Sequence, residues 1–189
     1  VEHMGIILPA VGLGASVAGY GAMMQIVSHA VTKSFCFFAA GAVLLTVGTR
    51  QIASVRQLIS HAPFASVALV FGGLAITGAP PLAVFLSEFS ILKAGLTQKE
   101  YLATALLALF IVIAFFGIML HVNKMVFGTD ENETVAADSQ IANSHLPVSC
   151  KLALIIAAIP VFVFGFYIPR PLQDLLTQAA AALTHQPSP

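Results

Sequence analysis

Charged residues are scarce in this sequence. Only 8% of its 189 residues are Asp, Glu, Lys or Arg, whereas 58% are hydrophobic. A soluble domain carries about 25% charged residues, so the shortage excludes an ordinary water-soluble fold and predicts an integral membrane protein. The eight acidic and eight basic residues balance, so no excess of positive charge favours nucleic acid as a partner.

Cysteines and cofactor motifs are equally scarce. Cys36 and Cys150 lie in or beside apolar runs, without the spacing of metal ligands, and we interpret them as small hydrophobic residues. The sequence has no C-x-x-C, no H-E-x-x-H and no cluster of carboxylates suited to a metal. The glycine-rich run at 12–19 lacks the strand context of a nucleotide-binding loop, so it indicates close helix packing. We expect no cofactor, metal or catalytic residue in this chain.

Long apolar runs make up most of the chain. A helix needs about 20 apolar residues to cross a bilayer core of about 30 Å. Five regions approach or exceed that length: 5–20, 22–47, 62–96, 101–127 and 151–168. The sequence therefore predicts an all-α polytopic bundle of about five transmembrane helices. The third region is interrupted by "TGAPP", Thr77 to Pro81, and is expected to be a broken helix.

The basic residues outside these runs bear on topology. If the third region crosses the membrane once, one side receives Arg50, Arg56, Lys124 and Lys151, and the other receives Lys99 and Arg170. The positive-inside rule then places the first group in the cytoplasm and the C-terminus outside. If the third region crosses twice, the C-terminus changes sides.

The two ends of the chain differ from its centre. The N-terminus has neither an initiator Met nor a signal peptide, so we expect the chain to begin inside a longer protein. Near the C-terminus, helical spacing predicts an amphipathic segment on the membrane surface, with apolar residues at Leu172, Leu175, Leu176, Ala179 and Leu183. We divide the chain into a transmembrane bundle at 1–168 and this surface segment with its tail at 169–189.

Two ionisable residues lie near the middle of the second apolar run. A Lys at the centre of a transmembrane helix costs roughly 2.5–3.5 kcal/mol on insertion scales. Lys33, His29 and Gln25 are spaced by four, which predicts one polar stripe along the helix. Burial disfavours the charged form of Lys, and His titrates near neutral pH, so the pair could pass a proton through a bridging water. The alternative is that Lys33 pairs with a carboxylate of another helix and only fixes packing.

The broken third region carries a second ionisable candidate. Pro80 and Pro81 remove two backbone donors, and non-helical backbone at membrane depth is tolerated only where protein or water surrounds it. Broken helices are common at ion sites in transporters. Glu88 follows the break by about two turns, and Lys93 lies about 140° further round the helix, so the two are not expected to pair. The alternative is a plain turn between two short spans, with Glu88 at the membrane interface.

Three further residues are weaker candidates for the same path. His121, near the end of the fourth apolar run, is either a relay member or a buried hydrogen-bonding residue. Glu2 and His3 are adjacent, directly before an apolar run, and could be polar members of the same path. The candidate proton path thus comprises Lys33, His29, Glu88, His121, Gln25, Lys93, Glu2 and His3.

Several motifs in order resemble one known family. "EHMGI", "HAVTKSFCFFAAG" and "GAPPLAVFLSEF" are similar to the antiporter-like proton-translocating subunits of respiratory complex I, group 4 hydrogenases and multisubunit sodium/proton antiporters. They look most similar to the F component of hydrogenase-4. The resemblance covers residue 1 to about residue 127. It implies the C-terminal portion of a multi-pass subunit of the cell inner membrane, with about fourteen transmembrane helices.

The resemblance also implies roles for individual residues. In that family charged residues form a hydrated file along the membrane midplane, and His29, Lys33 and Glu88 match members of it. The family's Glu and Lys of the first repeat have no counterpart in this chain. The implied function is proton translocation as a subunit of a redox-driven hydrogenase or NADH dehydrogenase-like complex. Nickel-iron, iron-sulfur or quinone sites are then expected in partner subunits alone, including a peripheral oxidoreductase arm.

Two other functions remain open from the sequence. Sodium/proton exchange is an alternative within the same functional class. The sequence does not exclude it, because it shows no recognisable set of residues that would form a cation-binding cage. A non-conducting scaffold that anchors a peripheral oxidoreductase belongs to a different class. A scaffold has no reason to retain buried titratable residues such as Lys33 and Glu88, whereas a proton channel requires them.

Overall fold

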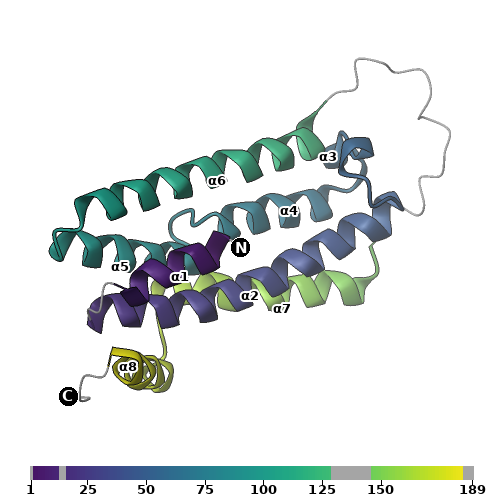
Figure 1. Cartoon of the computed structure of the whole chain (residues 1–189). Coiled ribbons are helices and arrows are strands. Elements are labelled where there is room, and N and C mark those ends of the chain that lie inside the picture. The colour runs from purple at the N-terminus through teal and green to yellow at the C-terminus, as the bar shows by residue number, and fades with distance from the viewer. Residues whose placement is uncertain (1, 13–15, 129–145, 185–189) are drawn as a thin grey trace.

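The computed structural model describes residues 2–12, 16–128 and 146–184, and within these ranges every regular element is a helix. The all-α prediction is therefore confirmed for the described residues (Figure 1). The elements in chain order are α1 (Glu2–Gly12), α2 (Ser16–Val47), a 3-10 turn (Ile52–Ser54), α3 (Leu58–His61), α4 (Pro63–Ile76), α5 (Ala83–Thr97), α6 (Tyr101–Phe127), α7 (Val148–Phe166) and α8 (Arg170–Thr184).

Three described helices are long and apolar enough to cross a membrane: Val17–Val47 within α2, Tyr101–Phe127 (α6) and Val148–Phe166 (α7). The expected first run, 5–20, is instead divided between two helices, because α1 ends at Gly12 and Tyr20 already belongs to α2. At 1.5 Å per residue, the 11 residues of α1 extend about 16 Å, which is shorter than a bilayer core.

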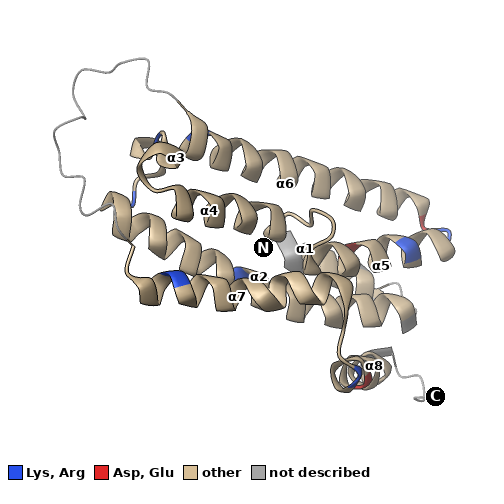
Figure 2. Ribbon diagram, turned by 180° about the vertical axis from the view of Figure 1, so that it is seen from behind, with Lys and Arg blue, Asp and Glu red and all other residues tan. Residues whose placement is uncertain are grey.

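The broken helix is present where the sequence predicts it. α4 has 14 residues and α5 has 15, so they extend about 21 Å and about 22 Å and neither crosses a core of about 30 Å alone. Both views show α4 and α5 following one another along the bundle, beneath the continuous α6 (Figures 1 and 2). Their succession along the bundle is the arrangement that a single crossing requires, which is the first of the two topologies considered above; the crossing itself stays a prediction.

The helix ends that carry the first group of basic residues lie together. The end of α2, all of α3, the end of α6 and the start of α7 lie at one end of the bundle (Figure 1). A hydrogen bond from Gln57 N to Gly128 O, 3.1 Å long, joins the start of α3 to the end of α6. Charged residues are sparse along the helices and gather mainly near their ends and on α8 (Figure 2).

α2 is the central helix, and its buried face has a regular spacing. Buried positions along one seam alternate by three and four residues: Ala18, Gly21, Gln25, Ser28, Thr32, Phe35, Ala39, Ala42 and Thr46. This spacing is that of helices packed at a shallow angle, each with one seam facing its neighbours. The seam changes character along α2, since its middle is polar at 25–32 and its later part is apolar at 35–42.

Small residues bring the helices together. A Cβ added at Gly21 of α2 would lie 2.9 Å from Ile91 Cγ1 of α5, and one added at Gly73 of α4 would lie 3.2 Å from Val122 Cγ2 of α6. Both helix pairs therefore approach more closely than a side chain at these glycines permits. Such close approach is how helices associate in a membrane, where apolar burial alone gives little driving force.

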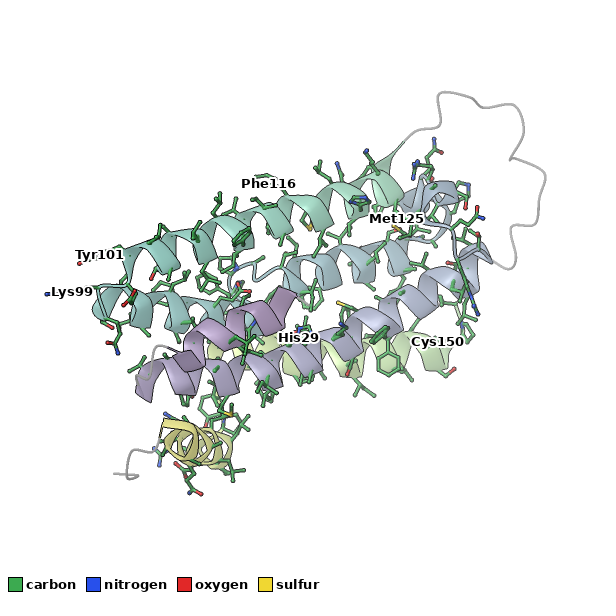
Figure 3. The ribbon with its side chains drawn as sticks, viewed as in Figure 1. His29, Lys99, Tyr101, Phe116, Met125 and Cys150 are labelled. Atoms are coloured by element: carbon green, nitrogen blue, oxygen red, sulfur yellow. The ribbon has the colours of Figure 1, made fainter. Side chains whose placement is uncertain are left out.

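The outer surface is apolar. α6 exposes large hydrophobic side chains along most of its length: Leu102, Leu106, Leu109, Phe110, Val112, Ile113, Phe116, Leu120 and Phe127. Phe116 points away from the bundle (Figure 3). A water-soluble protein rarely exposes an apolar surface of this extent, so α6 faces lipid or other apolar segments.

α8 lies across one end of the bundle and is seen almost end-on in Figure 1. It packs against α2, with Leu176 and Ala180 buried and Leu175 exposed. The predicted helical segment near the C-terminus is thus a helix with one face on the bundle. Its position at a membrane surface, and the division of the chain at residue 168, remain predictions.

Candidate functional site

The break between α4 and α5 is a compact turn whose polar groups are largely satisfied. Thr77 Oγ1 donates to Gly73 O at 2.8 Å, and Ala79 N donates to Leu74 O at 3.0 Å. Gly78 has a φ of +70°, a left-handed conformation that favours glycine. Leu82 N donates to Ala79 O at 3.0 Å and leads into α5. These bonds replace the helical ones that the two prolines cannot make.

α7 lies against one side of the break. A Cβ added at Gly165 would overlap the Pro81 carbonyl oxygen and lie 2.9 Å from its carbon. The backbone of α7 therefore lies directly against the irregular backbone of the turn. Non-helical backbone at membrane depth requires a protein or water surround, and this contact supplies protein on one side of the break, whereas Pro80 and Pro81 are exposed within the described residues.

Glu88 lies against this break. Its side chain is only 5% exposed. A Cβ added at Gly78 would overlap Glu88 Oε2, lie 3.0 Å from its Cδ and lie 3.4 Å from its Oε1. The carboxyl group thus lies on the Cα of Gly78. Glu88 is therefore buried between helices, and its depth in the membrane stays a prediction.

A hydrogen bond between two buried side chains joins α5 to α2 beside Glu88. Ser87 Oγ donates to the side-chain oxygen of Gln25, and the Val84 carbonyl, 2.8 Å away, is its alternative acceptor on α5. Both Gln25 and Ser87 are completely buried. The structure therefore brings Gln25 and Glu88, two residues of the predicted path, to the same part of the α2–α5 interface.

The other two members of the predicted α2 stripe turn away from this interface. His29 is half-buried midway along the bundle (Figure 3), and Lys33 is exposed. The physical reason is the spacing: four residues span 400° of an α-helix, so each step rotates the stripe by about 40°. The expectation that Lys33 is buried among the described residues is wrong.

Lys33 lies instead at an open apolar groove. Side chains of α2, α4 and α6 line a cavity of about 330 Å³ that includes Lys33, Cys36, Gly72 and Ile118. The Cys36 thiol donates to Gly72 O at 3.4 Å across this region. Lys33 thus borders a largely apolar groove and is itself exposed.

The remaining predicted residues do not join the cluster. Lys93 is exposed on α5, away from the buried Glu88, as their angular separation predicts. His121 is exposed, and its Nδ1 lies 2.7 Å from Gly117 O on the same helix. Of the two alternatives for His121, a buried hydrogen-bonding residue is therefore wrong, because α6 packs only one narrow face on the bundle. Its role as a relay member stays a prediction. Glu2 and His3 belong to α1, but their side chains lie outside the described part of the structure.

The buried polar residues that sequence reasoning missed include Ser28, Thr32 and Ser87. The signal was available, because residues 25, 28 and 32 have the three-and-four spacing of a buried helix face. Thr32 Oγ1 is buried without a hydrogen-bond partner among the described residues. A buried hydroxyl of this kind is a place where an ordered water is expected.

Metal chemistry gains no support from the described residues, since no three of their His, Cys, Asp or Glu side chains form a group that could hold an ion. The described site therefore consists of the buried carboxyl group of Glu88 at the helix break, beside the hydrogen-bonded side chains of Gln25 and Ser87.

Comparison with known sequences matches residues 1–129 to the family described as NADH:quinone oxidoreductase/Mrp antiporter, transmembrane. The "Hydrogenase-4 component F homolog" of Methylacidiphilum infernorum is 36% identical over 169 residues, covering 89% of this chain and 33% of the relative. A Na(+)/H(+) antiporter subunit of Alkalihalophilus pseudofirmus is 22% identical, covering 92% of this chain and 36% of the relative. The chain thus spans about a third of the length of these relatives.

A solved structure supports the fold. The Mrp complex from Dietzia sp. DQ12-45-1b contains a chain that superposes with a TM-score of 0.77 at 17% identity, covering 96% of this chain and 41% of that one. Together with the match over residues 1–129, the helical bundle and its broken helix show that this chain is a multi-pass membrane protein that belongs to the NADH:quinone oxidoreductase/Mrp antiporter transmembrane family.

Proposed function

We propose that this chain translocates protons, and that Glu88 is the group that accepts and releases them at the helix break. The observation that carries the proposal is the burial of this carboxyl group against Gly78, inside an apolar protein. Ionisable residues inside a membrane protein mark ion pathways by default. In water at neutral pH a carboxyl group is mostly ionised, and burial disfavours this charged form. The charged and neutral forms then differ less in free energy, which suits a site that must both take up and release a proton.

The remaining members of the path are assigned by their position on α2. Gln25 orients Ser87 at the α2–α5 interface, and half-buried His29 follows one turn later. Waters beside Thr32, whose hydroxyl is available within the described residues, would extend the path toward Lys33. In this proposal Lys33 exchanges protons at the groove, His29 and waters relay them, and Glu88 holds them at the break.

The proposed setting is a redox-driven membrane complex. Similarity to a hydrogenase-4 component F homolog and to a subunit of the NADH-quinone oxidoreductase of Desulforudis audaxviator supports it. Other membrane subunits and a peripheral oxidoreductase arm would be partners, and nickel-iron, iron-sulfur or quinone sites would lie in those partners. The cell inner membrane is the proposed location.

Sodium/proton exchange is the second candidate, and it has a specific observation in its favour. The Na(+)/H(+) antiporter subunit of Alkalihalophilus pseudofirmus aligns with 92% of this chain. The same buried carboxyl group would then alternate between binding a proton and binding Na⁺. The two candidates differ in the transported ion and agree on the role of Glu88.

The test replaces Glu88 by Gln in the full complex reconstituted in vesicles. We expect Glu88→Gln to abolish lumen acidification during redox turnover, because an amide cannot release a proton. The matched control is Glu100→Gln, which removes an exposed carboxyl group beside the α5–α6 turn and should leave acidification unchanged. Lumenal Na⁺ measured in parallel decides between the two ions. Normal acidification by Glu88→Gln would contradict the proposal and favour a scaffold role.

A further inference from the structure

Gly78 differs from most glycines of this chain, because two independent constraints act on it. Its φ of +70° lies in the left-handed region, where a Cβ crowds the backbone and residues with a side chain are strained. In addition, a side chain at Gly78 would occupy the space of the Glu88 carboxyl group. The first constraint concerns the shape of the turn, and the second concerns the position of an ionisable group.

Gly48 provides an internal comparison. It has nearly the same conformation, with a φ of +73°, but a Cβ added there would meet none of the described residues within 4 Å. The two glycines thus share the backbone constraint and differ in the steric one. Any effect that is specific to Gly78 therefore reports on its contact with Glu88 and is separable from the strain of a left-handed residue.

The rest of the site holds Glu88 in this place. The neighbouring Ser87 is bound to Gln25 of α2, and this bond fixes the rotation of α5 about its own axis at that turn. On the other side, Gly165 of α7 lies against Pro81, which fixes the end of the break. Between these two contacts, the buried carboxyl group lies against the Cα of Gly78.

We propose that Gly78 is the positioning residue of Glu88, with its bare Cα forming the surface on which the carboxyl group rests. This inference rests on the proposed role of Glu88 in proton translocation and adds a consequence. Because the turn and the carboxyl group share one contact, a change in the backbone of the break displaces the proton-binding oxygens. The conformation of the helix break thereby controls where Glu88 presents its proton.

The experiment compares Gly78→Ala with Gly48→Ala in the full complex reconstituted in vesicles. Both variants carry the same left-handed strain, but only Gly78→Ala displaces the carboxyl group. A displacement of about 1 Å lowers the rate of a positioned reaction by up to about a hundredfold. We therefore expect lumen acidification to fall by about ten- to a hundredfold in Gly78→Ala and to stay unchanged in Gly48→Ala.

A rescue variant distinguishes positioning from a general structural effect. Glu88→Asp shortens the side chain by one methylene and makes room for the methyl group that Gly78→Ala introduces. We expect the double variant Gly78→Ala/Glu88→Asp to recover much of the acidification that Gly78→Ala loses. Equal losses in Gly78→Ala and Gly48→Ala, or no rescue by Asp, would overturn the inference.

An infrared measurement keeps the two proposals separable. The carboxyl band of Glu88, identified by its disappearance in Glu88→Gln, should shift in Gly78→Ala and stay in place in Gly48→Ala. An unshifted band overturns the positioning role even if Glu88→Gln abolishes translocation. A shifted band supports it even if Glu88→Gln translocates normally, in which case the proposed function alone fails. Should Gly78→Ala fail to fold, Gly78→Asn, which tolerates the left-handed conformation, takes its place.

Discussion

The surroundings of Glu88 and Lys33 make the most informative comparison in this molecule. Both are ionisable residues in long apolar runs. Glu88 is enclosed by the described chain, on Gly78 of the break and beside the Ser87–Gln25 hydrogen bond. Lys33 is exposed at a groove between α2, α4 and α6. The difference shows that the described residues complete one of these sites and leave the other open.

The two environments predict different responses to substitution. Around Glu88 the packing is tight and the polar groups are paired, so changes there should destabilise the fold as well as the site. Lys33 is exposed, so removal of its ammonium group should affect stability little. Three substitutions test this contrast.

The largest effect is expected where α7 packs against the break. Gly165→Ala places a methyl group on the Pro81 carbonyl, and such overpacking against backbone costs roughly 1–3 kcal/mol or more. Gly117→Ala of α6 is the control, since its added Cβ would meet nothing within 4 Å and it should be neutral or slightly stabilising. Thermal unfolding in detergent measures both. Equal midpoints for Gly165→Ala and the parent would show that α7 does not pack against the break.

A smaller effect is expected at the hydrogen bond between α2 and α5. Ser87→Ala leaves the buried oxygen of Gln25 without its donor, which costs roughly 1–3 kcal/mol. Combining Ser87→Ala with Gln25→Leu should cost less than the sum of the two single changes, because the pair is removed together. Ser34→Ala is the control, as its hydroxyl donates to Ala30 O of the same helix on an exposed face. Additive effects in the double-mutant cycle would contradict the link.

The smallest effect is expected at Lys33. Lys33→Met keeps the length of the side chain and removes the charge, and the free energy of unfolding should change by no more than about 0.5 kcal/mol. Thermal unfolding of the chain alone and of the full complex should then be compared. Loss of stability confined to the full complex would show that a partner or another segment completes the Lys33 site. Loss in the chain alone would contradict the open groove.

Much of the site was predictable from individual residues. Two consecutive prolines shortly after Gly78 predict a helix break wherever they occur at membrane depth, because they remove backbone donors. A carboxyl group two turns later, in an apolar run, predicts a buried functional residue. The observed turn at 77–82 and the burial of Glu88 agree with the structural part of both predictions. Local chemistry was sufficient here because the prolines and the acid act within one stretch of chain.

The α2 stripe was predicted less well, for a geometric reason. Residues 25, 29 and 33 share one side of a helix only approximately, and the seam that faces α5 alternates steps of three and four. Ser28 and Thr32 therefore lie in the protein where His29 and Lys33 were expected. The exposure of His121 was not predictable for a different reason. α6 is apolar all round, and since lipid and protein interior are equally apolar, its sequence does not reveal which face packs inward.

The sequence by itself determined that this chain is a helical membrane protein, that one helix breaks at the prolines, and that an acid follows the break. Those properties depend on apolar length and backbone donors, which are local. Only the tertiary structure decided that Glu88 rests on Gly78, that Ser87 joins Gln25, and that Lys33 opens to a groove. Those properties depend on the rotation of each helix against its neighbours, and in an apolar membrane that rotation is set by close packing of small residues.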